Sequence, residues 1–180
     1  AQGVGRLVPG EIGGGFRMSA VLTWPIAALR KMRESDLPSV MAIEQPSYDF
    51  PWTNAIFRDC MRVGYHCQVY DSERGVLGYG IMSLGSGECH LLNLCIHPDF
   101  RTRGLGSQLV GYLLDVARSK NAEIALLEVR ISNHTAHRLY TRMGFNEIGL
   151  RKNYYPARRG REDALVLARD LGHGLGIVWR

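Results

Sequence analysis

The chain has 180 residues, of which 46% are hydrophobic and 22% charged, and its formal net charge is +5. This length allows one domain with a hydrophobic core, and the composition is that of a globular protein rather than a fibrous or disordered one. The positive charge favours an acidic partner, such as a phosphate-rich cofactor or RNA. No apolar run reaches the roughly 18 residues that a membrane-spanning helix needs, so we expect no membrane partner.

Cysteine and histidine spacing gives no sign of a metal or redox site. Four cysteines are present, and they lie at Cys60, Cys67, Cys89 and Cys95. No two of them form a C-x-x-C pair, so we expect buried, reduced thiols in a cytoplasmic protein. His134 and His137 are three residues apart on a predicted helix, but no third ligand has a suitable spacing. We therefore expect no metal.

The two ends of the chain differ from its middle. Residues 1–17 are Gly-rich without periodicity and are followed by Met18. We expect residues 1–20 to be a flexible leader of native or added origin, residues 21–171 to form a single domain, and residues 172–180 to be a tail.

Periodicity and turn residues predict the element order β-α-α-β-β-β-α-β-α-β-β. Ser35 or Asp36 can cap the first helix and Thr53 the second. The order predicts an α/β protein with a mixed sheet and helices on both faces. The expected strands are 26–33, 65–71, 76–84, 89–96, 124–131, 145–150 and 163–169, and the expected helices start near 36, 54, 105 and 133. Residues 45–53 and 151–162 are expected to be loops.

The stretch RTRGLGS, residues 101–107, separates a central strand from a helix of about four turns. Glycines at 104 and 106 allow unusual backbone conformations and keep side chains out of the way. The backbone N–H groups of a helix N-terminus can then hold a pyrophosphate, and Arg101 and Arg103 add charge. Neither G-x-G-x-x-G nor a P-loop is present. By spacing alone, a phosphate site and an ordinary strand–helix junction remain open.

Longer motifs favour the phosphate site. Arg101-x-x-Gly104-x-Gly106 and the later LEVRISNHTAHRLYTRMGF resemble motifs of the GNAT acetyltransferase superfamily. With LLNLCIHPDFRTRGLG and NYYPARRGREDALVLARDL, they closely resemble the RimI-type ribosomal-protein-alanine N-acetyltransferases, from about Ile26 to Leu171. The resemblance implies a GNAT fold: a mostly antiparallel sheet of about six to seven strands, splayed at its centre, with about four helices.

The resemblance also implies acetyl-CoA as co-substrate. The backbone at the end of the central strand would hold the pantetheine arm, and the following loop the pyrophosphate. Asn133 would contact the cofactor, although it can also simply cap a helix. The implied cofactor-binding residues are Leu94, Cys95, Ile96, Thr102, Arg103, Gly104, Leu105, Gly106, Ser107 and Asn133. Cys95 is expected to have a packing role only.

The implied reaction is attack of a free α-amine on a thioester. Such an amine has a pKa near ~7.7–8.0, so a base must take its proton. The resemblance assigns this role to Glu128, a carboxylate in an otherwise apolar strand, and assigns the proton-donor role to Tyr140. The alternatives from the residues alone are an outward-facing strand glutamate and a core tyrosine.

The acceptor would be the N-terminal peptide of a small-subunit ribosomal protein, beginning with alanine. Trp52, Tyr154 and Tyr155 are the expected walls of its groove, unless these aromatics only stabilise their loops. Glu44 or Asp49 would attract a basic peptide. The run Arg158, Arg159 and Arg161 suits either ribosomal RNA or solvent.

Two other functions remain open at this stage. One is a GNAT enzyme that acts on lysine side chains or small amines. The other is a ribosome- or RNA-binding module with a vestigial cofactor site. The preferred hypothesis is a monomeric enzyme that needs no nucleic acid.

Overall fold

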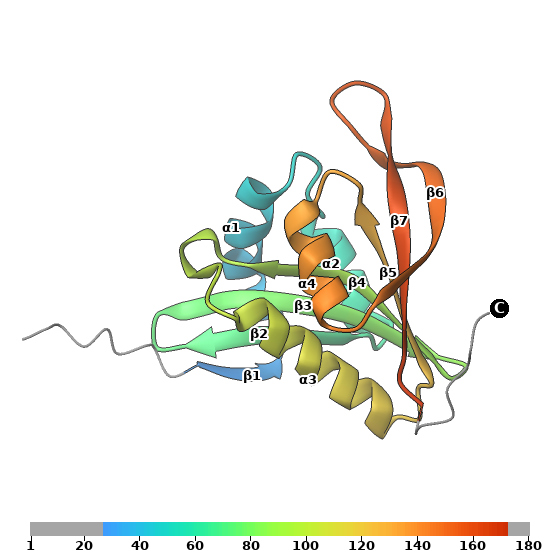
Figure 1. Ribbon diagram of the computed structural model, residues 1–180. Helices are drawn as coiled ribbons and strands as arrows, with labels where there is room; N and C mark the ends of the chain where they lie inside the picture. The colour runs from blue at the N-terminus through green and yellow to red at the C-terminus, as the bar shows by residue number, and fades with distance from the viewer. Residues whose placement is uncertain (1–26, 173–180) are drawn as a thin grey trace, which may run out of the picture.

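The computed structural model describes residues 27–172, which form one seven-stranded sheet with helices on both faces (Figure 1). The strand order is β1-β2-β3-β4-β5-β7-β6, and β4–β5 is the parallel pair among otherwise antiparallel neighbours. The strands are β1 (Ala27–Lys31), β2 (His66–Ser72), β3 (Gly75–Gly85), β4 (Glu88–Ile96), β5 (Ile124–Arg130), β6 (Asn146–Pro156) and β7 (Arg161–Asp170). The α-helices are α1 (Leu37–Ser47), α2 (Asn54–Arg62), α3 (Leu105–Ser119) and α4 (His134–Arg142).

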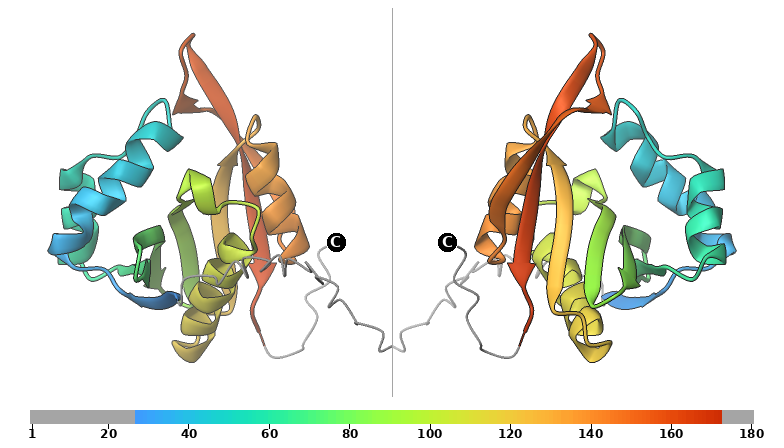
Figure 2. Two further views of the ribbon diagram at one scale, coloured as in Figure 1. Left: turned by 90° about the vertical axis from the view of Figure 1, so that its left-hand side faces the viewer. Right: turned by 90° about the vertical axis from the view of Figure 1, so that its right-hand side faces the viewer.

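Each face of the sheet has its own core. Helices α1 and α2 pack on one face, around Phe57, Val69 and Tyr79. Helices α3 and α4 pack on the other face, around Leu109 and Leu127. Figure 2 shows the two helix pairs on opposite sides of the sheet. The expected α/β class, with helices on both faces, is confirmed.

Several local predictions are confirmed. Thr53 caps α2 by accepting a hydrogen bond from the Ile56 N–H, and Gly144 ends α4 with a positive φ of 81°. All four cysteines are free and buried. Burial raises the pKa of Cys67 to about 12 and that of Cys89 to about 11, so both thiols stay protonated at neutral pH. Residues 1–26 and 173–180, which include the predicted leader and most of the predicted tail, lie outside the described residues. Within the described range, no helix has the length and apolar character needed to cross a membrane.

Two predicted loops are wrong in part. Helix α1 continues to Ser47 with Pro46 in its last turn, where a proline removes only one helical hydrogen bond. Strand β6 extends to Pro156, so Tyr154 and Tyr155 lie on a strand rather than at a loop tip. Pairing with β7, which places Tyr155 opposite Glu162, decides this conformation. The local sequence is polar and does not by itself predict a strand at these residues.

The sheet opens at its centre. Strands β4 and β5 pair from Glu88 opposite Ile124 to Leu91 opposite Leu127, and the pairing then stops. The rest of β4 stays paired with β3 alone, after an irregularity in which Leu92 has no partner residue. Figure 1 shows the two strands parting towards α1 and α4. The predicted central splay is therefore present, and it leaves one edge of Asn93–Ile96 open.

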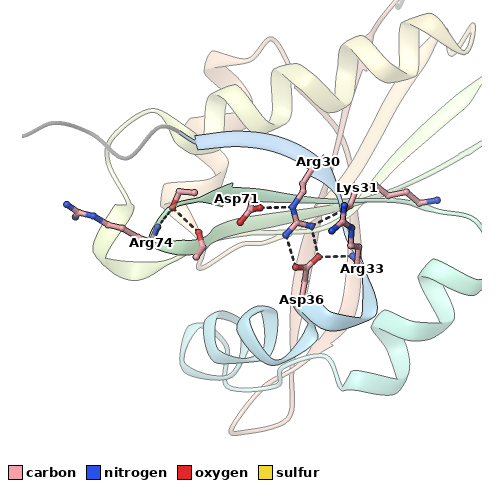
Figure 3. Close-up of polar contacts among 8 residues, drawn as sticks. Arg30, Lys31, Arg33, Asp36, Asp71 and Arg74 are labelled. Carbon is pink, nitrogen blue, oxygen red and sulfur yellow. Dashed lines mark hydrogen bonds and ion pairs between the residues drawn. The ribbon is translucent and has the colours of Figure 1, made fainter.

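An ion-pair cluster joins the edge strand β1 to the start of α1 (Figure 3). The Arg30 guanidinium donates two hydrogen bonds to the Asp36 carboxylate, both 2.8 Å long, and a third of 2.7 Å to Asp71 on β2. The Arg33 N–H also donates to Asp36, at 2.7 Å. The hydrogen bonds from Arg30 hold the pKa of the Asp36 carboxyl below its usual range.

We expect Asp36→Asn to lower the free energy of unfolding by about 1–3 kcal/mol at pH 7, because a buried charged hydrogen-bond acceptor is lost. A carboxyl with a lowered folded-state pKa stabilises the fold above its unfolded pKa, near ~3.9, and this stabilisation disappears as the pH falls through the folded pKa. The difference between the two proteins should therefore shrink below about pH 4 in urea titrations. Asp59→Asn, in an exposed pair with Arg62, is the control and should change little. Equal losses for both variants at pH 7 would contradict the prediction.

Candidate active site

The loop before α3 forms a concave array of backbone N–H groups. Thr102 and Gly104 have positive φ angles of 61° and 80°, and α3 starts directly afterwards. The N–H groups of Leu105, Gly106 and Ser107 belong to the first helical turn and have no acceptor among residues 27–172. This helix end carries partial positive charge and can bind an anion.

The side chains of the two arginines of this loop make contacts within the chain. The Arg101 guanidinium turns back, donating to the Ile96 carbonyl at 2.9 Å and to Ser47 Oγ at 2.8 Å. It therefore joins the end of β4 to the end of α1, and its expected role of adding charge for a phosphate stays a prediction. Arg103 stacks on the Phe100 ring at 5.5 Å.

A cavity of about 1170 Å³ runs from this loop into the splay. It is lined by the end of β4, by the loop before α3, by the start of α4 and by the β6–β7 turn. Nine of the ten predicted cofactor residues line it; Arg103 does not. The lining set is Leu94, Cys95, Ile96, Thr102, Gly104, Leu105, Gly106, Ser107 and Asn133.

The open edge of β4 is partly occupied by side chains. The Leu94 carbonyl accepts a hydrogen bond from the Tyr48 hydroxyl at 3.1 Å, and Arg101 occupies the Ile96 carbonyl. Cys95 lies opposite Tyr79 in the β3–β4 ladder, and its buried side chain packs on the α1–α2 face. Two backbone carbonyls at this edge, those of Leu94 and Ile96, are therefore already hydrogen-bonded to side chains.

Asn133 occupies the N-cap position of α4. Its Oδ1 accepts a hydrogen bond from the Ala136 N–H at 3.1 Å, as a helix cap does. The residue also lines the cavity, so its amide nitrogen is available to donate a hydrogen bond to a ligand. His134 and His137 follow it, and the described part of the chain has no group of three or more His, Cys, Asp or Glu side chains placed to hold a metal ion.

Glu128 lies one residue beyond the last β4–β5 pair, at the apex of the splay. Its side chain is only 8% exposed. His90 Nε2 is 2.7 Å from Oε2, and Arg151 Nη2 is 3.2 Å from Oε1. The Arg151 contact is an ion pair without hydrogen-bond geometry, which leaves Oε1 buried with no hydrogen bond among the described residues. Glu128 is therefore a buried, charge-paired carboxylate, and one of its oxygens, Oε1, has no hydrogen bond among the described residues. It is not an outward-facing strand residue.

Tyr140 is a buried tyrosine on the inner face of α4. Its ring packs against Phe145 with 5.7 Å between centroids. Burial raises the pKa of its hydroxyl to about 12, and the nearby Cys95 thiol adds to the shift. The hydroxyl has no hydrogen-bond partner among the described residues, whereas a purely structural buried tyrosine usually has one. It therefore stays protonated at neutral pH and is free to donate.

Of the three predicted groove residues, Trp52 lies in the loop between α1 and α2, and Tyr154 and Tyr155 lie on β6. None of them lines the cavity. Trp52 packs on Phe57 with 5.5 Å between ring centroids. Tyr155 donates its hydroxyl hydrogen to the Glu128 backbone carbonyl at 3.0 Å, so it supports the strand that carries Glu128. Tyr154 is 39% exposed and stacks with Arg151.

The two acidic residues expected to attract a peptide are both engaged. Glu44 is only 1% exposed; it accepts from the Trp52 N–H at 2.7 Å and from the Tyr79 hydroxyl. Asp49 receives two hydrogen bonds from Arg158, of 2.6 and 3.1 Å, which join the α1–α2 loop to the β6–β7 turn. Glu44 is therefore an internal anchor for the Trp52 loop, and its expected surface role is wrong.

Sequence reasoning missed three side chains at this site: Tyr48, His90 and Arg151. Tyr48 contacts Leu94, and His90 and Arg151 contact Glu128. One signal was available for His90, a lone ionisable residue in the apolar run CHLLNLCI. Tyr48 and Arg151 have no local signal, because their contacts join distant segments.

Comparison with known proteins agrees with this geometry. A family model described as "Acetyltransferase (GNAT) family" matches residues 27–145. The chain belongs to the GNAT acetyltransferase family.

Within that family, it is similar to ribosomal protein S18-alanine N-acetyltransferases and to an Ard1 protein. It is 36% identical over 134 residues to the ribosomal protein bS18-alanine N-acetyltransferase of Salmonella typhimurium, covering 74% of this chain and 90% of that protein. The crystal structure of the ribosomal-protein-S18-alanine N-acetyltransferase from Escherichia coli superposes with a TM-score of 0.77 and 30% identity, covering 86% of this chain and 100% of the other. Ard1 from Thermoplasma volcanium has a TM-score of 0.76 and 29% identity, with 82% and 99% covered.

Proposed function

We propose that this protein transfers the acetyl group of acetyl-CoA to the N-terminal alanine of a small-subunit ribosomal protein, in the cytoplasm. The observation that carries the proposal is the buried Glu128 carboxylate at the apex of the splay. The cavity beside the N–H array of α3 reaches Leu94 on β4 and Arg130 on β5, the two strands that part there, although Glu128 itself does not line it. The similarity to the bS18-alanine N-acetyltransferases supports the choice of acceptor. The structure and the comparisons favour neither a lysine acceptor nor an RNA-binding module.

The chain's residues fit acetyl-CoA. The unpaired N–H groups of Leu105, Gly106 and Ser107 suit a pyrophosphate. The stretch of β4 that β5 leaves unpaired, residues 93–96, suits the amides of a pantetheine arm. A Cβ at Gly106 would lie 3.4 Å from Leu139 Cδ2, so the glycine keeps this approach clear. When bound, the cofactor would supply the acetyl thioester.

Glu128 and Tyr140 would divide the proton transfers. Glu128 takes the proton from the attacking amine, directly or through water, at the oxygen that has no hydrogen bond. Tyr140 gives its proton to the departing sulfur. Burial raises the pKa of Tyr155, and the nearby Glu128 and Tyr140 side chains add to the rise, so the three side chains lie near one another.

A panel of acceptors tests the function. Purified protein is incubated with acetyl-CoA and one of three peptides: one with a free N-terminal alanine, one with a blocked N-terminus, and one with a lysine as its only amine. We expect acetylation of the free alanine only, without added RNA. Acetylation of the lysine peptide alone would overturn the proposed acceptor, and no turnover without RNA would favour the binding-module hypothesis. Mass spectrometry of ribosomal proteins treated with the enzyme then identifies the natural acceptor.

Tyr140→Phe should lower kcat by about 10²-fold, because the departing thiolate loses its proton donor. Phenylalanine keeps the packing against Phe145, and the hydroxyl has no partner to lose, so the melting temperature should stay near that of wild type. The affinity for acetyl-CoA, measured by calorimetry, should also be retained. Tyr112→Phe, on the partly exposed side of α3, is the matched control. A wild-type kcat in Tyr140→Phe would remove the donor role.

A further inference from the structure

The Glu128 carboxylate contacts a second titratable group at the point where β4 and β5 part. His90 lies opposite Leu126 in the last paired stretch, so Glu128 follows two residues later on the same face of β5. This places His90 Nε2 at 2.7 Å from Glu128 Oε2. The histidine is 30% exposed and the glutamate 8%, so the histidine has more contact with solvent. On its other side His90 lies opposite Ser83 of β3, which does not titrate.

The other side chains that face Glu128 neither gain nor lose a proton near neutral pH. Arg151 of β6 is near Oε1, and a guanidinium remains protonated in proteins. Tyr155 of β6 donates its hydroxyl hydrogen to the Glu128 backbone, and burial raises its pKa, so it also remains protonated. Val166 of β7, opposite Glu128, has no ionisable group. Among the side chains in contact with this carboxylate within residues 27–172, only that of His90 is of a type that commonly exchanges protons near neutral pH.

We propose that His90 and Glu128 form one coupled proton acceptor, in which His90 is a positioning residue whose own charge decides whether Glu128 can accept a proton. This inference rests on the role of Glu128 proposed above. A neutral His90 donates its Nε2–H to Oε2, which orients the carboxylate and leaves Oε1 to receive the proton. A protonated His90 holds an ion pair with the carboxylate and makes it a weaker base.

The proton balance of the reaction is then complete. The amine nitrogen attacks the thioester carbon, the C–N bond forms, and the C–S bond breaks. The proton that leaves the nitrogen passes to the His90–Glu128 pair, and the sulfur takes a proton from Tyr140. The pair loses its proton to solvent, and Tyr140 regains one, before the next turnover.

The test compares His90→Gln with His90→Leu in kcat–pH profiles at saturating peptide. A glutamine amide can donate to Oε2 but does not titrate, so it separates orientation from charge. We expect His90→Gln to keep a kcat near that of wild type at alkaline pH. Its acidic limb should move to lower pH by about 1–2 units, because glutamine cannot become positively charged beside Glu128. His90→Leu removes the contact and should lower kcat at every pH.

Controls exclude a merely structural effect. Melting temperature and acetyl-CoA affinity should match wild type in both variants, and His66→Gln, on β2, should leave the profile unchanged. An unshifted acidic limb in His90→Gln, or a uniform loss of kcat at every pH, would overturn the role of the His90 charge. If the wild-type enzyme acetylates no N-terminal alanine, the proposed acceptor is wrong. The role of His90 is then tested by the same kcat–pH profiles, measured with whichever amine the enzyme does acetylate.

Discussion

Glu128→Gln is expected to lower kcat by about 10²–10⁴-fold, while the affinity for acetyl-CoA stays unchanged. The substitution keeps the size of the side chain and removes its ability to take a proton. The carboxylate lies at the apex of the splay rather than in the cavity that we assign to the cofactor, so cofactor binding should not depend on its charge. Steady-state kinetics with an N-terminal alanine peptide and calorimetry with acetyl-CoA separate the two effects.

The control for this variant is Glu147→Gln. Glu147 lies on the exposed strand β6, and its substitution should leave kcat unaltered. The peptide amine must also lose a proton, so kcat is compared at several pH values at and above its pKa of ~7.7–8.0, where the amine is increasingly neutral. A kcat in Glu128→Gln close to wild type over this range would show that another group is the base. A parallel loss of acetyl-CoA affinity would show that the charge serves binding instead.

Gly106→Val should have the second large effect, a loss of acetyl-CoA affinity of about 10- to 100-fold. A Cβ at this position already meets Leu139 Cδ2 at 3.4 Å and Ile96 Cγ1 at 3.9 Å, and valine adds two methyl groups beyond it. These groups must point towards the cavity or push α3 and α4 apart. In both cases about one charge-assisted hydrogen bond from the α3 N–H groups is lost, worth about 1.5–3 kcal/mol, which corresponds to the expected loss of affinity.

Gly111→Ala in the middle of α3 is the matched control. Its added Cβ would meet only Met143 Cε, at an ordinary 3.9 Å, and alanine favours the helix. Acetyl-CoA affinity, measured by calorimetry, should be unchanged in this variant, and Gly106→Ala should fall between the two. If Gly106→Val bound acetyl-CoA as tightly as wild type, the N–H array of α3 would not be the pyrophosphate site.

The sequence by itself determined the class of fold and the order of its elements. Thr53, Asn133 and Gly144 mark helix ends because their preferences act within a few residues of chain. The glycines before α3 predict the exposed N–H array for the same local reason. Motif resemblance also selected Glu128 and Tyr140, but it did not state what surrounds them.

Only the tertiary structure decided those surroundings. The strand conformation of Tyr154 and Tyr155 depends on pairing with β7, and the burial of Glu44 depends on Tyr79 and the Trp52 loop. The Arg101 guanidinium donates to the Ile96 carbonyl and to Ser47, which lie on two other elements of the fold. His90 and Glu128 are 38 residues apart in sequence and meet only because β4 and β5 run parallel up to Leu91. Contacts between distant segments depend on the register of the whole sheet, which no short stretch of sequence encodes.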